Sequence, residues 1–156
     1  MRAADIMRTS FATVRQSAPL LDAIHLLLET NQRGLPVVDD AGSLVGIISE
    51  GDFLHRRELE VDYPEGFWLE WLLGKDEGQF ARERTSGLRV DAVMSRHPVW
   101  VDDNAKIEEV VKQMDIYQIS QVLVLRGKKL AGIIGRTQLL VALEQRLKRS
   151  TQELRQ

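Results

Sequence analysis

The strongest indication of the fold lies in residues 35 to 52. They read Leu35-Pro36-Val37-Val38-Asp39-Asp40-Ala41-Gly42-Ser43-Leu44-Val45-Gly46-Ile47-Ile48-Ser49-Glu50-Gly51-Asp52. Two short apolar runs, each of strand length, flank a polar turn that contains glycine, a pattern typical of a β-hairpin. The first run is too apolar for a strand with one face in water, so we expect it to be buried. A helix is expected to begin at about Ser49.

The same pattern occurs a second time along the chain. Ala4–Val38 aligns without a gap on Asp91–Leu125, and after one residue is dropped in the turn, Leu44–Ile48 aligns on Leu130–Ile134. Identities are few, but the apolar positions agree nearly throughout. We therefore interpret the sequence as the product of an internal duplication.

Each copy is expected to begin with a short strand, at Phe11–Val14 and Val99–Val101, followed by an amphipathic helix. Ser17 and Asn104 are the predicted N-caps of these helices, with Pro19 in the first turn. The predicted buried stripes are Leu20, Ile24, Leu27 and Leu28 in one copy and Ile107, Val111 and Met114 in the other. Two strands and a closing helix follow, the second helix from about Arg136.

The sequence predicts an α/β (α+β) fold of two strand-helix-strand-strand-helix repeats. Repeat 1 covers 1–56, a helical connector 57–89, repeat 2 covers 90–144, and 145–156 form a helix end or tail. A unit of roughly 50 residues is too small to bury both faces of its sheet. We therefore expect the repeats to pack together as one pseudo-twofold domain.

The duplicated series of a helix, Leu-Pro-Val-Val-Asp, a turn and Leu-Val-Gly-Ile-Ile-Ser-x-x-Asp resembles a tandem cystathionine-β-synthase (CBS) domain pair. The resemblance covers Ala3–Arg56 and Val90–Glu144, and its specificity lies in the order and duplication of the motifs. It implies a disc-like module that often dimerises. It also implies clefts between the repeats for adenosine-containing ligands such as AMP, ADP, ATP, NAD or S-adenosylmethionine.

The resemblance places a ligand site where the closing helix of repeat 1 begins. There the Asp52 carboxylate would accept hydrogen bonds from both ribose hydroxyls, since it is an acceptor with two oxygens. Ser49 would bind ribose or phosphate near free helix N–H groups. The same Ser49-x-x-Asp52 spacing also fits a helix capping box, and the two roles can coexist.

The resemblance completes this cleft with residues from both repeats. Arg33 is a candidate phosphate partner, although a solvated surface arginine is the alternative. Three apolar side chains would sandwich the adenine: Ile47, Val99 and Ile119. The remaining expected ligand-binding positions are Gly34, Met94 and Ser120.

Repeat 2 provides an internal control, because its matching sequence is Gly132-Ile133-Ile134-Gly135-Arg136-Thr137-Gln138. Glycine replaces Ser49, and Gln138 replaces Asp52. An amide keeps one acceptor oxygen but has no charge. The resemblance therefore supports one competent cleft at Asp52 and a degraded one at Gln138.

Composition and missing motifs exclude several functions. Lys and Arg total 21 against 23 for Asp and Glu, which gives no sign of a nucleic-acid partner. The chain has no cysteine, and its three histidines, His25, His55 and His97, show no metal-ligand spacing. We find no nucleophile–base pair, Walker loop or Gly-rich dinucleotide turn, so we expect no enzyme, no metal and no required cofactor. Without a signal peptide or membrane span, the expected location is the cytoplasm.

The preferred hypothesis is a regulatory module that binds an adenosine-containing ligand and passes a conformational change to a partner. The alternatives are a structural dimerisation module with a vestigial pocket and an unrecognised enzyme. An aromatic helix at Phe67–Leu73 would serve as extra core or as a dimer or effector contact. We expect a homodimer, with an effector protein or a missing C-terminal domain as further partners. The tail, Leu139–Gln156, is expected to be a helix that frays into solvent or the start of a link to another domain.

Overall fold

The structure is a computed structural model that describes residues 1–54 and 88–155. The aromatic helix expected at Phe67–Leu73 lies outside these residues, as does His55. Within the described ranges, no helix is long and apolar enough to span a membrane.

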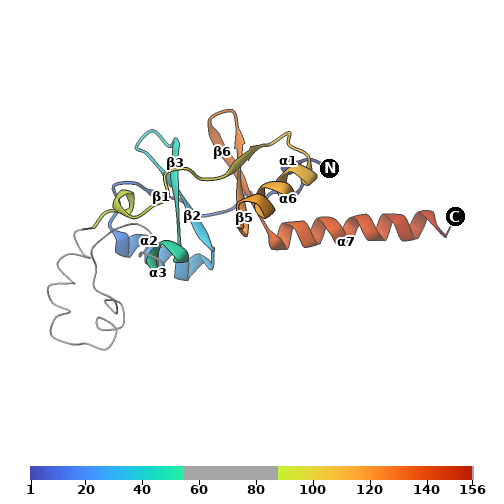
Figure 1. Cartoon of the computed structure of the whole chain (residues 1–156), viewed down its shortest axis with the longest axis horizontal. Helices are drawn as coiled ribbons and strands as arrows, with labels where there is room; N and C mark the ends of the chain where they lie inside the picture. Colours follow the sequence, from blue (N-terminus) through green and yellow to red (C-terminus); the bar gives the residue numbers. More distant parts are fainter. Residues whose placement is uncertain (55–87, 156) are drawn as a thin grey trace. The chain divides into compact units, whose positions relative to one another are not determined.

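In each repeat a short helix that was not predicted comes first, and the predicted strand-helix-strand-strand-helix order follows (Figure 1). Repeat 1 contains α1 (Ala3–Ile6), β1 (Val14–Arg15), α2 (Leu20–Thr30), β2 (Gly34–Val38), β3 (Leu44–Ser49) and α3 (Glu50–Leu54). Repeat 2 contains the 3₁₀ helix η2 (Val90–Ala92), β4 (Trp100–Asp102), α6 (Ile107–Ile116), β5 (Gln121–Arg126), β6 (Lys129–Gly135) and α7 (Arg136–Glu153). The mixed α/β prediction is confirmed.

Each repeat forms a three-stranded sheet, with strand orders β1-β2-β3 and β4-β5-β6. Strand β1 runs parallel to β2 with Val14 opposite Val37, and β4 runs parallel to β5 with Val101 opposite Val124. The sequence alignment of the two copies places Val14 on Val101 and Val37 on Val124. The duplication therefore extends to the register of the paired strands. The hairpin turns contain Gly42 and Gly127, whose φ angles of 84° and 63° lie in the left-handed region that favours glycine.

The chain divides into two compact units whose boundaries differ from those of the repeats. The β4–β6 unit contains Met1–Phe11, Gly42–Leu44 and the described residues of Pro98–Gln156. The β1–β3 unit contains Ala12–Ala41 and the described residues of Val45–His97. The pseudo-twofold packing of the two repeats stays a prediction.

The segment that precedes each repeat's first strand packs in the unit built on the other repeat's sheet. We call residues 1–11 and 88–97 the lead segments. In the β4–β6 unit, the Ala3 N–H donates to the Ala105 carbonyl at 2.8 Å, and the Arg8 N–H donates to the Ile133 carbonyl at 2.8 Å. Ala3 is completely buried there. The first lead segment is therefore part of the core beneath β4–β6.

The second lead segment makes the corresponding contacts in the β1–β3 unit. The Val90 N–H donates to the Ala18 carbonyl at 2.9 Å, and the Leu20 N–H donates to the Leu88 carbonyl at 2.9 Å. Val90 is completely buried in the same core cluster as Val14. The two repeats thus exchange their lead segments.

This exchange corrects the predicted helix starts. Ser17 and Asn104 are not the N-caps: α2 begins at Leu20 and α6 at Ile107, after Pro19 and Lys106 in extended backbone. Pro19 therefore precedes the first turn. The residues before each helix pair with a lead segment instead, Pro19 with Arg89 and Lys106 with Arg2.

Two predicted core positions are also wrong. Leu28 is 78% exposed and Val111 is 47% exposed, whereas Ala23 and Val110 are completely buried. Ala23 lies three residues after the buried Leu20, and Val110 lies three residues after Ile107, so they share the inward face. The predicted stripes lacked the small Ala23 and placed the inward position of α6 one residue too late, at Val111.

Candidate functional site

The site region begins where β3 meets the second lead segment. The Ile47 N–H donates to the Ser95 carbonyl at 3.0 Å, and the Ser95 N–H donates to the Ile47 carbonyl at 2.9 Å. A Cβ atom on Gly46 would lie 2.6 Å from the Ser95 carbonyl oxygen and 2.8 Å from the Met94 sulfur. Only glycine allows the lead segment to approach β3 this closely. The Met94 side chain is buried in the β1–β3 core, while Ile47 is half-buried.

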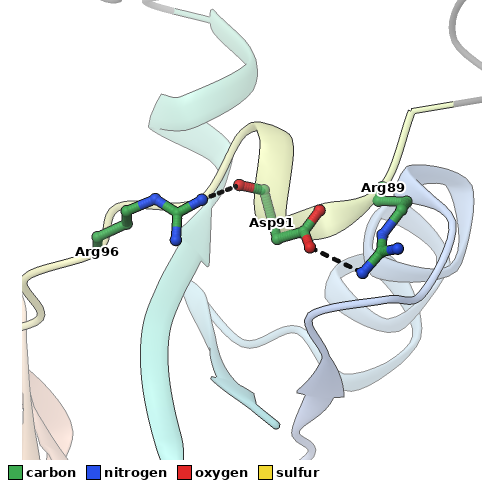
Figure 2. Close-up of polar contacts among 3 residues, drawn as sticks. All are labelled: Arg89, Asp91 and Arg96. Carbon is green, nitrogen blue, oxygen red and sulfur yellow. Dashed lines mark hydrogen bonds and ion pairs between the residues drawn. The ribbon is translucent and has the colours of Figure 1, made fainter.

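Asp91 organises the same lead segment (Figure 2). Its carboxylate accepts a hydrogen bond from Arg89 at 2.9 Å, and its backbone carbonyl accepts one from the Arg96 guanidinium at 3.2 Å. The Asp91 N–H donates to the Gln16 carbonyl at 3.0 Å, which ties the segment to the β1–β3 unit. These bonds fix the backbone that leads to Met94, one of the predicted ligand-binding residues.

At the junction of β3 and α3, Asp52 caps the helix. One oxygen of its carboxylate, Oδ2, accepts a hydrogen bond from the Ser49 N–H at 2.8 Å and lies 3.3 Å from the Ser49 hydroxyl oxygen, which donates to it. The first bond is the return half of a capping box. The return bond that a Ser49-x-x-Asp52 capping box predicts is therefore present. A carboxylate has roughly four acceptor sites on its two oxygens, so capping and recognition of ribose are chemically compatible.

The matching junction of β6 and α7 contains the same bond. The Gly135 N–H donates to the Gln138 side-chain oxygen at 2.8 Å. A neutral amide thus caps this helix at the same distance as the carboxylate does in repeat 1. The two junctions differ in the charge of Asp52 and in the hydroxyl of Ser49, for which repeat 2 has no counterpart.

Arg33 and Gly34 lie at the start of β2, a neighbour of β3. In repeat 2 the register places Gln121 opposite Gly135, and these residues align with Gly34 and Ser49. The start of β2 and the end of β3 therefore lie at the same edge of the sheet. The exposed Arg33 precedes that edge, on the side where α3 begins.

Three predicted ligand-binding residues belong to the β4–β6 unit: Val99, Ile119 and Ser120, all half-buried. The Val99 carbonyl accepts a hydrogen bond from the Leu123 N–H at 3.2 Å, and Ile119 packs against the core of this unit. The Ser120 carbonyl oxygen lies 3.7 Å from the position of a Cβ on Gly135. That these three residues line one cleft together with Asp52 stays a prediction.

Gln32, which was not among the predicted site residues, is a buried polar residue whose exposed fraction is 7%. Its side-chain oxygen accepts a hydrogen bond from the Ala12 N–H at 2.6 Å, and its amide nitrogen donates to the carbonyls of Ala12 and Gly34, both at 3.2 Å. It thereby fixes the backbone on both sides of Arg33. The signal was available, because the alignment places polar Gln32 on apolar Ile119 and Ala12 on Val99.

No group of three or more side chains that could hold a metal ion occurs among residues 1–54 and 88–155. The geometry of the repeat 1 junction instead combines an anionic acceptor, a hydroxyl and a nearby arginine. Such a combination can recognise a polyhydroxylated, phosphorylated molecule through hydrogen bonds.

The family model for the CBS domain matches residues 3–58 and 90–145. The chain is therefore built from a tandem pair of CBS domains. It belongs to the CBS domain family.

Of three relatives, two align over most of the chain and one aligns over about a third of it. A CBS domain-containing protein of Dictyostelium discoideum is 29% identical over 136 residues, which cover 86% of each chain. Human 5'-AMP-activated protein kinase subunit gamma-3 is 28% identical over 133 residues, which cover 85% of this chain but 24% of that subunit. The chloroplastic CBS domain-containing protein CBSX2 of Arabidopsis thaliana is 47% identical over 57 residues, or 36% of this chain and 24% of CBSX2. The matched residues thus make up about a quarter of the length of two of these relatives.

Solved structures agree with this fold. The crystal structure of CBSX2 in complex with AMP has a TM-score of 0.70 and 26% sequence identity, and the match covers 92% of this chain and 96% of that one. The CBS domain of a membrane protein from Sphaerobacter thermophilus has a TM-score of 0.70 and 28% identity, with 90% and 86% of the two chains covered.

Proposed function

We propose that this chain is a regulatory module that binds an adenosine-containing ligand at the repeat 1 junction and transmits a conformational change to a partner. One observation carries the proposal: the two junctions share a 2.8 Å capping bond, but only repeat 1 has a carboxylate at the capping position and a hydroxyl on the last residue of the strand. Helix capping needs a single acceptor, which Gln138 supplies without charge. The charge of Asp52 and the hydroxyl of Ser49 therefore exceed what the cap requires.

The proposed roles follow from the chemistry of each group. Asp52 accepts from the two ribose hydroxyls, Ser49 binds ribose or phosphate, and Arg33 pairs with phosphate. The adenine packs between apolar side chains from both repeats: Ile47, Val99 and Ile119. The complex of CBSX2 with AMP, a match of similar length, supports an adenosine-containing ligand.

A structural role is the second candidate, because one observation favours it. The hydrogen bonds between Ser49 and Asp52 already give both side chains a function within the fold. In that case the chain is a dimerisation module whose pocket is vestigial.

Isothermal titration of the full chain with AMP, ADP, ATP, NAD and S-adenosylmethionine separates the two candidates. We expect at least one of them to bind with one site per chain at concentrations below about 1 mM. The 2'-deoxy form of the best ligand should bind about tenfold more weakly, because it lacks one donor to Asp52. A guanine nucleotide with the same phosphates is the control for the base. If none of the five ligands binds at millimolar concentration, the chain is the structural module.

A further inference from the structure

A row of leucines along α7, from Leu140 to Leu154, is left exposed by the described part of the chain. Ala142 is the helix's one buried residue, although α7 continues to Glu153 (Figure 1). Beyond it, Leu147 is 59% exposed and Leu154 is 88% exposed. A helical segment of this length is marginally stable in water by itself, and tertiary packing of its apolar face normally supplies the missing stability.

The row follows the spacing of a coiled coil. Its positions alternate by three and four residues: Leu140, Leu143, Leu147, Ser150 and Leu154. The Ser150 hydroxyl, the one polar group in the row, donates to the Arg146 carbonyl at 3.2 Å within the helix. Ser150 can therefore be buried in a helix–helix seam without leaving an unpaired hydroxyl.

We propose that this row binds the α7 helix of a second copy of the chain in an antiparallel pair. In this pairing Leu143 packs against the partner's Leu154, and Leu147 packs against the partner's Ser150. Arg146, which flanks the row, then faces the partner's Glu153. Twofold symmetry repeats every contact, so two ion pairs border the seam.

The flanking charges select this pairing over its competitors. A slip by one heptad would keep the leucines in contact but would place Arg146 against the partner's Arg146. A parallel pair would place Arg146 against the partner's Thr151, without an opposite charge. Charges beside the seam set the orientation and register of coiled coils in this way.

A groove beside Leu143 fits the same partner. Its volume is about 450 Å³, and its lining combines apolar side chains, among them Val111, Leu139 and Leu143, with the charged Glu108, Arg146 and Arg149. Within one chain, Arg146 pairs with Glu108 at 3.9 Å, and both side chains are more than 70% exposed. Such a pair contributes little, so Arg146 can exchange it for an acidic partner at the seam. The partner's Leu154 then reaches the apolar part of this groove, and the partner's Glu153 takes the place of Glu108 beside Arg146.

Sedimentation equilibrium of the full chain over roughly 5–500 µM tests the pairing. The unmodified chain should dimerise in this range, and Leu147→Lys should abolish the dimer. Arg146→Glu and Glu153→Arg should each weaken it about tenfold, since each loses two ion pairs and gains like charges. The double variant should recover to within about threefold of the unmodified chain. Arg155→Glu is the matched control, because it makes the same charge change away from the seam and should leave the dimer unchanged.

The orientation has its own measurement. The chain has no native cysteine, so Thr137→Cys gives a single site for a spin label. At 1.5 Å per residue, the antiparallel pairing places the two labels about 35 Å apart, whereas a parallel pair would place them within roughly 20 Å. A monomer throughout the concentration range overturns the proposal. So does a dimer that Leu147→Lys leaves intact, a double variant that fails to recover, or a short distance between the labels.

Discussion

The junctions β3–α3 and β6–α7 solve one structural problem with different chemistry. In each, the last residue of a strand donates its N–H to a side chain three residues later, at 2.8 Å. Repeat 1 uses the carboxylate of Asp52 for this, and repeat 2 uses the amide of Gln138. The fold therefore requires a hydrogen-bond acceptor at this position, but the acceptor does not need to be charged. The comparison between repeats therefore separates what the fold needs from what a ligand would need.

The largest expected effect concerns ligand affinity. Asp52→Ala should weaken binding of the adenosine-containing ligand by about 30- to 1000-fold, because it removes the acceptor of two charge-assisted hydrogen bonds. Gln138→Ala should change affinity by less than about threefold. Calorimetric titration of both variants measures the contrast, and equal losses would refute the interpretation that one junction is competent and the other degraded.

The glycines that admit the lead segments offer a second contrast, in stability. A Cβ at Gly46 would meet the Ser95 carbonyl oxygen at 2.6 Å, whereas a Cβ at Gly132 would meet the Met7 sulfur at 2.6 Å and the Arg8 carbonyl oxygen at 2.9 Å. Gly46→Ala and Gly132→Ala should each reduce the free energy of unfolding by about 1–3 kcal/mol. Gly46→Ala should be the more harmful, because its Cβ would lie 2.6 Å from a backbone oxygen, whereas the nearest backbone oxygen to a Cβ on Gly132 is 2.9 Å away.

Urea unfolding of the two glycine variants measures this difference, with Gln145→Ala on the exposed face of α7 as the control. Unchanged stability in both variants would show that the lead segments do not need their close approach to the strands.

The substitution Asp52→Gln separates the role of Asp52 in helix capping from its proposed role in ligand recognition, because it gives repeat 1 the amide that repeat 2 has at this position. The amide keeps the acceptor for the Ser49 N–H, so stability should change by less than about 0.5 kcal/mol, whereas Asp52→Ala should lose about 1 kcal/mol. Ligand affinity should still fall about tenfold, since the charge is gone. If Asp52→Gln binds as well as the unmodified chain, the carboxylate has no role beyond the cap.

The smallest expected effect is a pH dependence confined to one unit. In the β4–β6 unit, the hydrogen bond from the Arg126 guanidinium to Asp103, at 2.7 Å, lowers the pKa of the Asp103 carboxyl. Its contribution to stability is present above the carboxyl's ordinary pKa and is lost as the pH falls through the lowered value. Repeat 1 has Gln16 and Asp39 at the aligned positions and cannot form this pair.

Arg126→Gln should return the pKa of Asp103 toward its ordinary value, as followed by carboxyl NMR titration. The change in acid stability should be small, because Arg126 is exposed to solvent. A pKa that stays low in Arg126→Gln would assign the shift to another neighbour.

The order of elements was predictable from the sequence because the duplicated apolar pattern constrains both copies at once. The Ser49-x-x-Asp52 cap was predictable for a similar reason, since its chemistry is local. The helix starts were not: residues next to Pro19 and Lys106 pair with lead segments that are distant in the sequence. Local capping rules contain no information about such pairing. Gln32 escaped notice because its partners, Ala12 and Gly34, are backbone groups that no side-chain motif reveals.

The exchange of the lead segments also affects the order in which the two units can fold during synthesis. Residues around Arg8 leave the ribosome first, yet their backbone partner at Ile133 is among the last to be synthesised. The β1–β3 unit is better placed, since its last contributor, the segment up to His97, emerges well before the chain is finished. Domains tend to form as soon as their parts are available, and pairing between distant segments slows folding. The first residues of this protein should therefore be the last to reach their place, and trimming them should damage the unit at the opposite end of the sequence.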